Sequence, residues 1–233
     1  MTKLFIIAGH GAGDPGACAN GYQEAECVRR VAQRIKDLGT SSVTLGDFNR
    51  NYYADGGINN LGISKETEVL ELHLDSAAVS AKGGHVIIKQ GFEPDRFDIA
   101  LANWVEGCFP GRSQTIVKRD DLANPNRAAL IGQPYRLLEI CFISNANDIR
   151  KLMNDLDSVA IGILSAFGIS TSVSTPAAQI QTSATPPKIL YRVRISWGND
   201  KSQIGAFESL DNARRAATNA NPYKVFDENG MQV

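Results

Sequence analysis

The chain has 233 residues, a formal net charge of −1 and a sequence pI of about 6.3. This length allows one full α/β domain plus a small second unit, and the balanced charge gives no basis for binding nucleic acid or an anionic membrane. No apolar run approaches the roughly 20 residues that span a bilayer, and the run after Lys3 is too short for a signal-peptide core. We therefore expect no membrane insertion, and synthesis in the cytoplasm without a signal peptide.

The first predicted element is a short buried strand, residues 3–8, that ends in a glycine-rich loop holding His10. Ligands of open α/β sheets bind beyond the carboxyl ends of the strands, so a histidine in this loop is well placed for chemistry. Glycine-rich loops after a first strand also bind phosphate, but this one lacks the G-x-G-x-x-G spacing and any Gly-Lys-Ser/Thr. The loop therefore favours a site built around His10.

A helix is predicted over residues 24–38, and its apolar stripe is interrupted by one acid. Cys27, Val28, Val31 and Ile35 belong to the stripe, and Glu24 lies on the same face. A glutamate in the first turn that only favours the helix dipole would point to solvent. Glu24 is therefore a candidate functional residue.

The predicted strand 68–74 carries a second histidine near its carboxyl end. Leu70, Leu72 and Leu74 share one face, whereas His73 shares the other with Glu71 and Asp75. A lone strand histidine is usually a satisfied core residue, but two histidines at strand ends favour a ligand pair. His85, the third histidine, begins the predicted strand 85–89, so we expect it at the opposite edge of the sheet as an ordinary edge residue.

Glu139 is a single carboxylate within the apolar predicted strand 136–143. Burial of an unpaired carboxylate is costly or raises its pKa. Two interpretations stay open: an ion pair with an arginine, or a general base tuned towards neutral pH.

The remaining elements complete an alternating pattern of strands and helices that predicts an α/β fold, a mostly parallel sheet with helices on its faces. The further strands are predicted at 42–46, 85–89 and 114–118, and the further helices at 94–107, 125–131, 145–154 and 157–167. Residues 171–187 contain no charged residue and are rich in Ser, Thr and Pro, which predicts a linker. The predicted domains are therefore 1–170 and 188–233.

The four cysteines, Cys18, Cys27, Cys108 and Cys141, form no Cys-x-x-Cys pair, so we expect free thiols rather than structural zinc. Together, His10, Glu24 and His73 instead supply two imidazoles and a carboxylate, which suits catalytic zinc with one position left for water. Glu139 would then deprotonate that water. No His-Glu-x-x-His helix is present, which excludes the common zinc endopeptidase arrangement.

Four segments, taken in order, resemble the zinc-dependent N-acetylmuramoyl-L-alanine amidases of the Amidase_3 family, in particular endolysins of bacteriophages that act on Gram-positive walls. They are GHGAGDPGA around His10, YQEAECVRRVAQRI with Glu24, LELHLDSA with His73, and LLEICFISNANDIRKL around Glu139. The resemblance implies a six-stranded mixed sheet, Zn²⁺ on the two histidines and Glu24, and Glu139 as catalytic base. It also implies peptidoglycan as substrate and release of the enzyme through a holin pore during host cell lysis.

This sequence departs from the family pattern at two places. Many members have Asp-Pro-Gly-His where this chain has Ile7-Ala8-Gly9-His10, so any role of that aspartate is absent or filled by another residue. The usual His-x-Asn is His73-Leu74-Asp75, which places an extra charge near the metal. Glu26 is the alternative helix ligand, although it does not lead into the apolar stripe.

The C-terminal segment 188–233 is predicted to form a strand, a helix at about 209–219 and a strand, and resembles small wall-binding modules of lysins. Tyr191, Trp197 and Tyr223 suit sugar stacking or the core of the module. Because so short a domain rarely folds alone, and strand 191–197 offers an edge, we expect a homo-oligomer through this module. Two other functions stay open for the chain: a zinc peptidase that cuts the stem peptide, and a wall-binding protein with a structural metal.

Overall fold

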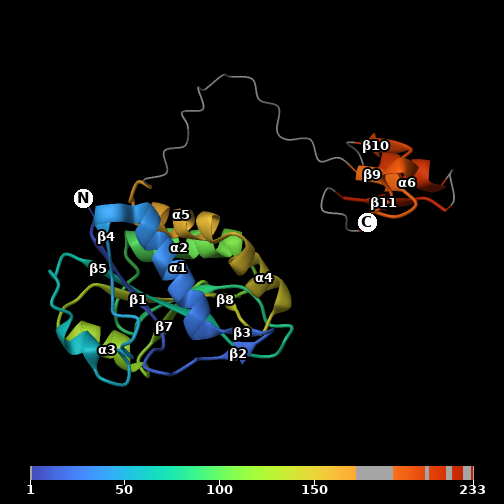
Figure 1. The fold of residues 1–233 in the computed structure, drawn as a ribbon. Coiled ribbons are helices and arrows are strands. Elements are labelled where there is room, and N and C mark those ends of the chain that lie inside the picture. The colour runs from blue at the N-terminus through green and yellow to red at the C-terminus, as the bar shows by residue number, and fades with distance from the viewer. Residues whose placement is uncertain (1, 172–190, 208–209, 219–221, 228–231, 233) are drawn as a thin grey trace. The chain divides into compact units, whose positions relative to one another are not determined.

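The computed structural model of the chain describes residues 2–171, 191–207, 210–218, 222–227 and 232 (Figure 1). It consists of two compact units, Met1–Ser174 and Thr175–Val233, which are treated separately below. Except for Thr171, the predicted linker 171–187 lies outside the described residues. In the part of the chain that is described, no helix is both long and apolar enough to cross a bilayer.

A six-stranded mixed sheet forms the centre of the first unit and confirms the predicted fold class. Its order is β4-β1-β5-β8-β6-β7, and β6 is antiparallel to β8 whereas every other neighbouring pair is parallel. The strands are β1 (Leu4–Ala8), β4 (Val43–Leu45), β5 (Glu68–Asp75), β6 (His85–Lys89), β7 (Ile116–Arg119) and β8 (Tyr135–Phe142). All six lie within a few residues of their predicted positions.

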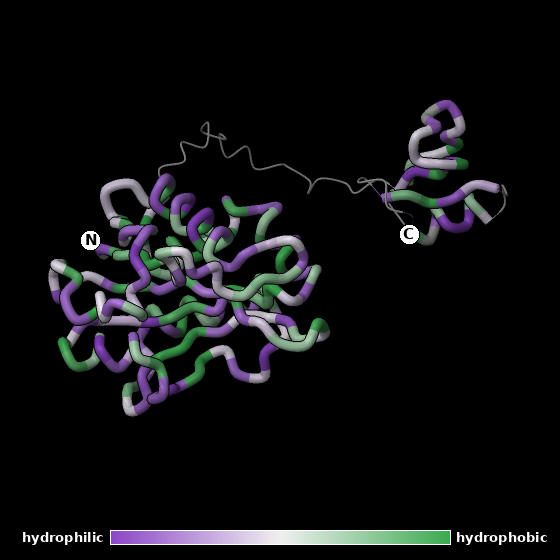
Figure 2. Tube along the Cα trace, turned by 60° about the horizontal axis from the view of Figure 1, so that its bottom comes forward, coloured by the Kyte–Doolittle hydropathy of each residue, from purple (hydrophilic) through white to green (hydrophobic). Residues whose placement is uncertain are grey.

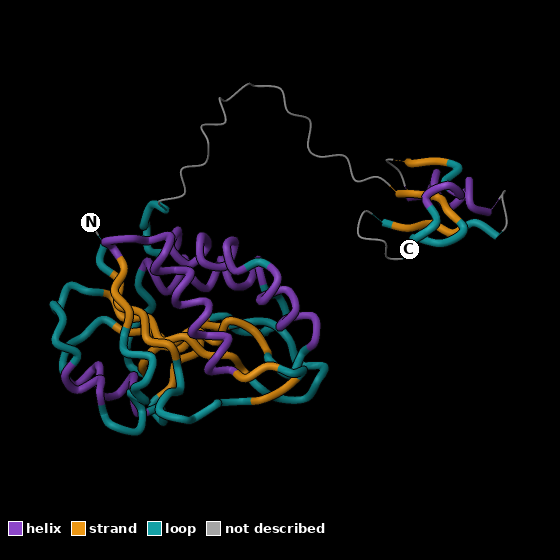
Figure 3. Tube along the Cα trace, in the orientation of Figure 1, coloured by secondary structure: helices purple, strands orange, loops and turns teal. Residues whose placement is uncertain are grey.

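Four helices cover one face of this sheet, which we call the helix face (Figures 1 and 3). Strand residues such as Ile6, Leu72, Leu138 and Val86 pack there against the apolar sides of the helices, and Figure 2 shows hydrophobic stretches along the inner strands. The helices are α1 (Glu24–Gly39), α2 (Arg96–Cys108), α4 (Ala146–Asn154) and α5 (Leu156–Ala166). The burial of this face accounts for most of the apolar core.

The opposite face, which we call the site face, has a smaller apolar cluster. Helix α3 (Ala123–Leu130) and the short 3₁₀ helix Gly57–Asn60 cover part of it through residues that include Ala128 and Ile58, and Tyr52 from the preceding loop joins them. Because side chains alternate along a strand, Glu71, His73 and Glu139 point to this face. A cleft of about 390 Å³ opens beside His10 and His73.

A short hairpin that was not predicted leads the chain into α1. Strands β2 (Cys18–Ala19) and β3 (Tyr22–Gln23) are joined by Asn20 and Gly21, which both have positive φ, at 51° and 80°. Asn-Gly with this backbone is the preferred two-residue hairpin turn. The hairpin places Glu24 at the first position of α1, next to the loop that holds His10.

The expectation that His85 lies at the opposite edge of the sheet is wrong, and so is the expectation that it is an ordinary edge residue. Strand β6 runs antiparallel to β8, so its first residue lies at the edge where β1, β5 and β8 end. His85 pairs in register with Glu139, is only 4% exposed, and belongs to a strand flanked on both sides. Only nine residues separate β5 from β6, which is too short for the crossover that a parallel strand needs.

The second unit is a three-stranded antiparallel sheet of order β10-β9-β11 with one described helix. Its elements are β9 (Tyr191–Arg194), a 3₁₀ turn Asp200–Ser202, β10 (Gly205–Phe207), α6 (Leu210–Thr218) and β11 (Lys224–Phe226). Tyr191 and Tyr223 pack against its core, whereas the Trp197 ring contacts Phe226 and the Arg194 guanidinium. Strand β9 is central, so the expectation that this strand offers a free edge is wrong.

Candidate metal centre

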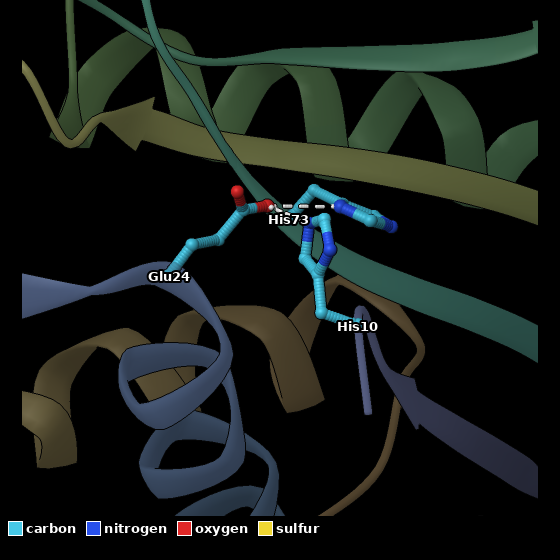
Figure 4. Close-up of side chains that lie close together, drawn as sticks. All are labelled: His10, Glu24 and His73. Carbon is cyan, nitrogen blue, oxygen red and sulfur yellow. Dashed lines mark hydrogen bonds and ion pairs between the residues drawn. The ribbon is translucent and has the colours of Figure 1, made fainter. Parts of the chain in front are cut away.

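His10, Glu24 and His73 come together at the carboxyl edge of the sheet (Figure 4). One ligand atom of each residue lies within 4.8 Å of the others, and the His10 and His73 ring centroids are 5.0 Å apart. One carboxylate oxygen of Glu24 contacts both rings, with Oε1 3.0 Å from His10 Nε2 and 2.9 Å from His73 Nδ1. Glu26, the alternative helix ligand, is exposed.

Glu24 is held in place by the backbone as well as by the histidines. Its Oε1 accepts from the Leu74 amide at 3.0 Å and its Oε2 accepts from the Ala17 amide at 3.0 Å. Burial by itself would raise the pKa of Glu24, but the hydrogen bonds from His10 and His73 hold it far below its ordinary value. Glu24 is therefore a fixed, ionised carboxylate.

The loop around His10 is shaped by close approach and by an unusual backbone. His10 itself has φ of 63°, a conformation rare for a residue with a Cβ atom, and such strain concentrates at functional sites. A Cβ atom on Gly9 would lie 2.4 Å from His73 Cε1, and one on Gly16 would lie 2.7 Å from His10 Cδ2. The glycines of this loop allow the backbone to approach both rings.

A second carboxylate stands behind each histidine, and neither was identified from the sequence as part of the site. His10 Nδ1 donates to Asp14 Oδ2 at 2.9 Å, and His73 Nε2 donates to Glu71 Oε1 at 3.0 Å. Asp14 also accepts from the Gly16 amide at 2.9 Å. Such carboxylates orient the ring and fix which nitrogen is free to bind a metal. Asp14 thus orients the His10 ring, and its own carboxylate is held by the Gly16 amide.

Glu71 is a buried acid with a full set of donors. Besides His73, it accepts from Asn124 Nδ2 at 3.1 and 2.9 Å and from the Tyr135 hydroxyl. Burial alone would raise the pKa of Glu71, but the hydrogen bond from His73 and its other donors lower it. For His73, burial opposes protonation, but Glu24 and Glu71 outweigh it and raise the pKa well above 6.5. Glu24 likewise raises the pKa of His10.

Glu139 lies beside His73 on the site face, because the two residues are register partners on β8 and β5. Burial raises the pKa of Glu139 to about 7. No ion pair of Glu139 is found among the described residues; Arg136, three residues earlier, is instead paired with Glu68, Asp95 and Asp98. The ion-pair interpretation of Glu139 is therefore not supported.

Asp75 does not join the cluster. Its Oδ2 lies 3.4 Å from Arg112 Nη1, and the same guanidinium donates from Nη2 to His85 Nε2 at 3.2 Å. The four cysteines are free, with Cys27 and Cys141 buried. The first unit is thus an α/β protein with a candidate metal centre at the carboxyl edge of its sheet.

A family model of the N-acetylmuramoyl-L-alanine amidases, Amidase_3, matches residues 4–171, and the chain belongs to this family. Among curated proteins, the probable autolysin PH of Staphylococcus aureus (strain NCTC 8325 / PS 47) is 31% identical over 205 residues. That match covers 80% of this chain and 42% of the relative, so the chain spans less than half of the relative's length.

Solved amidase structures share the fold of the first unit. The catalytic domain of CwlV from Bacillus (Paenibacillus) polymyxa var. colistinus has a TM-score of 0.57 at 19% identity, covering 72% of this chain and 96% of that one. The amidase of Clostridium difficile 630 has a TM-score of 0.57 at 17% identity, with 71% and 94% covered. The catalytic domain of the CD27L endolysin gives 0.55 at 17%, with 72% and 97% covered.

Proposed function

We propose that the chain is a zinc-dependent hydrolase that cleaves the amide bond between N-acetylmuramic acid and the L-alanine of the stem peptide in peptidoglycan. Its membership of the amidase family supports the substrate class. The observation that carries the mechanism is the cluster of His10, Glu24 and His73 with Glu139 beside it on one face of the sheet.

The donor set of this cluster fits zinc. Two imidazole nitrogens and one carboxylate oxygen are ligands that Zn²⁺ takes in catalytic sites, where three protein ligands leave one position open. The carboxylates of Asp14 and Glu71 behind the two rings match the outer partners that metal-binding histidines have. Bound Zn²⁺ would supply polarisation of the scissile carbonyl and a lower pKa for the attacking water.

Glu139 has the properties of the general base. Its pKa of about 7 allows it to accept a proton from the attacking water near neutral pH, and a nearby divalent cation would lower that pKa further. The protonated Glu139 can then give the proton to the leaving amine of L-alanine. Glu139 as a whole residue is partly exposed on the site face, whereas its Oε2 atom is buried.

The cleft beside His10 and His73 gives one side of the substrate a place to bind. Its walls include Asn51, Tyr52 and Tyr53 from the segment before the 3₁₀ helix, and Asn124 from α3. Aromatic rings and amides of this kind suit both sugar hydroxyl groups and peptide groups. The cleft therefore supports a substrate that extends away from the metal centre.

The second unit keeps its proposed role as a wall-binding or oligomerisation module. Because β9 is paired on both sides, the outer edges of this sheet are those of β10 and β11, and β11 carries a bridge from Phe226 to Gln232. That the chain is a phage endolysin released through a holin pore stays a prediction.

Digestion of purified Gram-positive cell walls, followed by mass analysis of the products, tests this function. We expect free stem peptides with an N-terminal L-alanine, uncut glycan strands and intact cross-bridges. Glu139→Gln should retain zinc and lose activity by roughly 10²–10⁴-fold. New amino groups within the stem or cross-bridge would identify a peptidase instead, and wall binding without products would identify a binding protein.

A further inference from the structure

His85 is a buried histidine that the proposed mechanism does not use. It begins β6, and the antiparallel pairing of β6 with β8 sets it directly opposite Glu139. His73 is the register partner of Glu139 on the other side. Directly opposite residues of paired strands point to the same face, so His73, Glu139 and His85 form one row across three strands of the site face.

Arg112 determines which nitrogen of His85 carries the proton. The guanidinium has donors only, and its Nη2 lies 3.2 Å from His85 Nε2, so Nε2 must accept. Burial, together with the charges of Arg112 and Arg119, lowers the pKa of His85 to about 4, which keeps the ring neutral near pH 7. A neutral ring whose Nε2 accepts carries its single proton on Nδ1.

Two buried polar atoms in this row lack partners among the described residues. They are His85 Nδ1, which is a donor in the tautomer set by Arg112, and Glu139 Oε2, which is an acceptor. Native proteins rarely leave such atoms unpaired, and those that remain call for an explanation in function. His85 Nδ1 and Glu139 Oε2 are thus a donor and an acceptor on directly opposite residues of neighbouring strands, the arrangement that a cross-strand hydrogen bond needs.

We propose that His85 is a positioning residue for Glu139, whose carboxylate it holds by donating a hydrogen bond from Nδ1 to Oε2 in the catalytic state. This inference rests on the proposed role of Glu139 as base. Catalytic hydrogen bonds often tighten only when substrate is bound, which agrees with the unpaired atoms seen here. With Oε2 held, the other carboxylate oxygen is directed to the attacking water. Arg112 acts one step further out, by fixing the tautomer of His85.

Three substitutions of His85 separate hydrogen bonding from packing. The Asn side chain puts an N–H close to the position of Nδ1, the Gln side chain puts it near Nε2, and Leu has none. We expect His85→Asn to keep kcat within about threefold, and His85→Gln and His85→Leu to lower kcat by roughly 10–100-fold, the usual effect of removing an outer-shell partner. KM and zinc content should not change in any variant.

Arg112→Met provides a coupled test. It should lower kcat in the wild-type background but have little effect in the His85→Asn background, because an amide has no tautomer to fix. Equal kcat values for His85→Asn and His85→Gln, or a His85→Leu variant as active as wild type, would overturn the inference. Loss of zinc from His85→Leu would also overturn it, since it would place His85 in the metal centre.

The protonation state of His85 can be measured without any enzyme assay, so the positioning role can be tested independently of the proposed amidase function. Imidazole ¹⁵N spectra of the metal-free protein resolve its three histidines, and His85→Asn identifies the His85 signals. We expect a neutral ring protonated at Nδ1 at pH 7, and loss of this preference in Arg112→Met. A ring protonated at Nε2 would refute the positioning role even if the chain proves to be a zinc amidase.

Discussion

Replacing Gly9 by alanine should damage the metal centre without touching any proposed ligand. The added Cβ atom would lie 2.4 Å from Cε1, 2.5 Å from Nε2 and 2.7 Å from Nδ1 of His73, whereas ordinary contacts begin at 3.4 Å. The imidazole would have to retreat by about 1 Å. Metal–ligand distances tolerate deviations of about 0.2 Å, so a shift of this size removes His73 as a full ligand.

The same shift strains the hydrogen bonds that hold the ring. His73 lies 2.9 Å from Glu24 and 3.0 Å from Glu71, and a retreat of that size takes at least one of these contacts beyond hydrogen-bonding distance. We expect zinc affinity to fall by at least ~10–100-fold, or about 1.4–2.8 kcal/mol. Overpacking should also cost about 1–3 kcal/mol of folding stability.

Competition with a chromophoric chelator measures the zinc affinity, and thermal unfolding of the metal-free protein measures stability. Gly107→Ala is the matched control, because Gly107 lies on the exposed side of α2 and the added Cβ would meet no atom within 4 Å apart from the neighbouring residues and backbone of its own helix. It should leave zinc affinity unchanged and stability equal to or slightly above wild type. If Gly9→Ala binds zinc within twofold of wild type, the placement of His73 as a ligand is wrong.

Three further outcomes are expected. Glu71→Gln replaces a carboxylate that accepts from His73 and Asn124 by an amide whose NH₂ group faces these donors. Zinc affinity should therefore fall by roughly 10–100-fold in the same competition assay. An unchanged affinity would exclude a role of Glu71 in orienting His73. Hydrogen bonds to Glu24 raise the pKa of both ligand histidines above 6.5, so zinc binding at pH 7 should release protons, and zinc affinity should increase as the pH rises beyond 6.5. Calorimetry in buffers of different ionisation enthalpy measures this proton release. A binding heat that does not depend on the buffer would contradict it. Arg136→Met leaves three carboxylates without their shared cation and should cost about 3–5 kcal/mol in urea unfolding, whereas Arg34→Met at an exposed pair should barely move the midpoint; similar midpoints for the two variants would contradict this.

Local patterns in the sequence were sufficient to predict most of the fold. Apolar runs and helical periodicity predict each strand of the six-stranded sheet and each α-helix of the first unit close to its observed bounds. The interruption of the α1 stripe by Glu24 identified the carboxylate that contacts both histidines. These signals succeed because they arise from residues close together in the chain.

The alternation of strands and helices predicts a parallel β6, but the connection between β5 and β6 is too short for the crossover that a parallel strand needs. A parallel β6 would put His85 at the opposite edge of the sheet, whereas the antiparallel β6 puts it at the edge where β1, β5 and β8 end. The hairpin before α1 does have a local signal in the sequence, the Asn20-Gly21 turn.

Strand alternation puts Glu71 on the same face as His73, but the contacts that hold the carboxylates behind the histidines depend on the tertiary structure. Glu71 meets Asn124 and Tyr135, which are 53 and 64 residues away in the chain. Asp14 contacts His10 within a glycine-rich loop in which His10 adopts a positive φ. Their roles become visible only once the tertiary structure brings these residues together.

The central claim is tested most directly by titrating the metal-free protein with zinc. At each step, the new N-terminal L-alanine amino groups that appear on digestion of purified walls are measured. We predict that activity rises linearly up to one equivalent of zinc and stays constant beyond it, and that His73→Ala shows no such rise. Full release of L-alanine termini by protein verified to be free of metal would contradict the account.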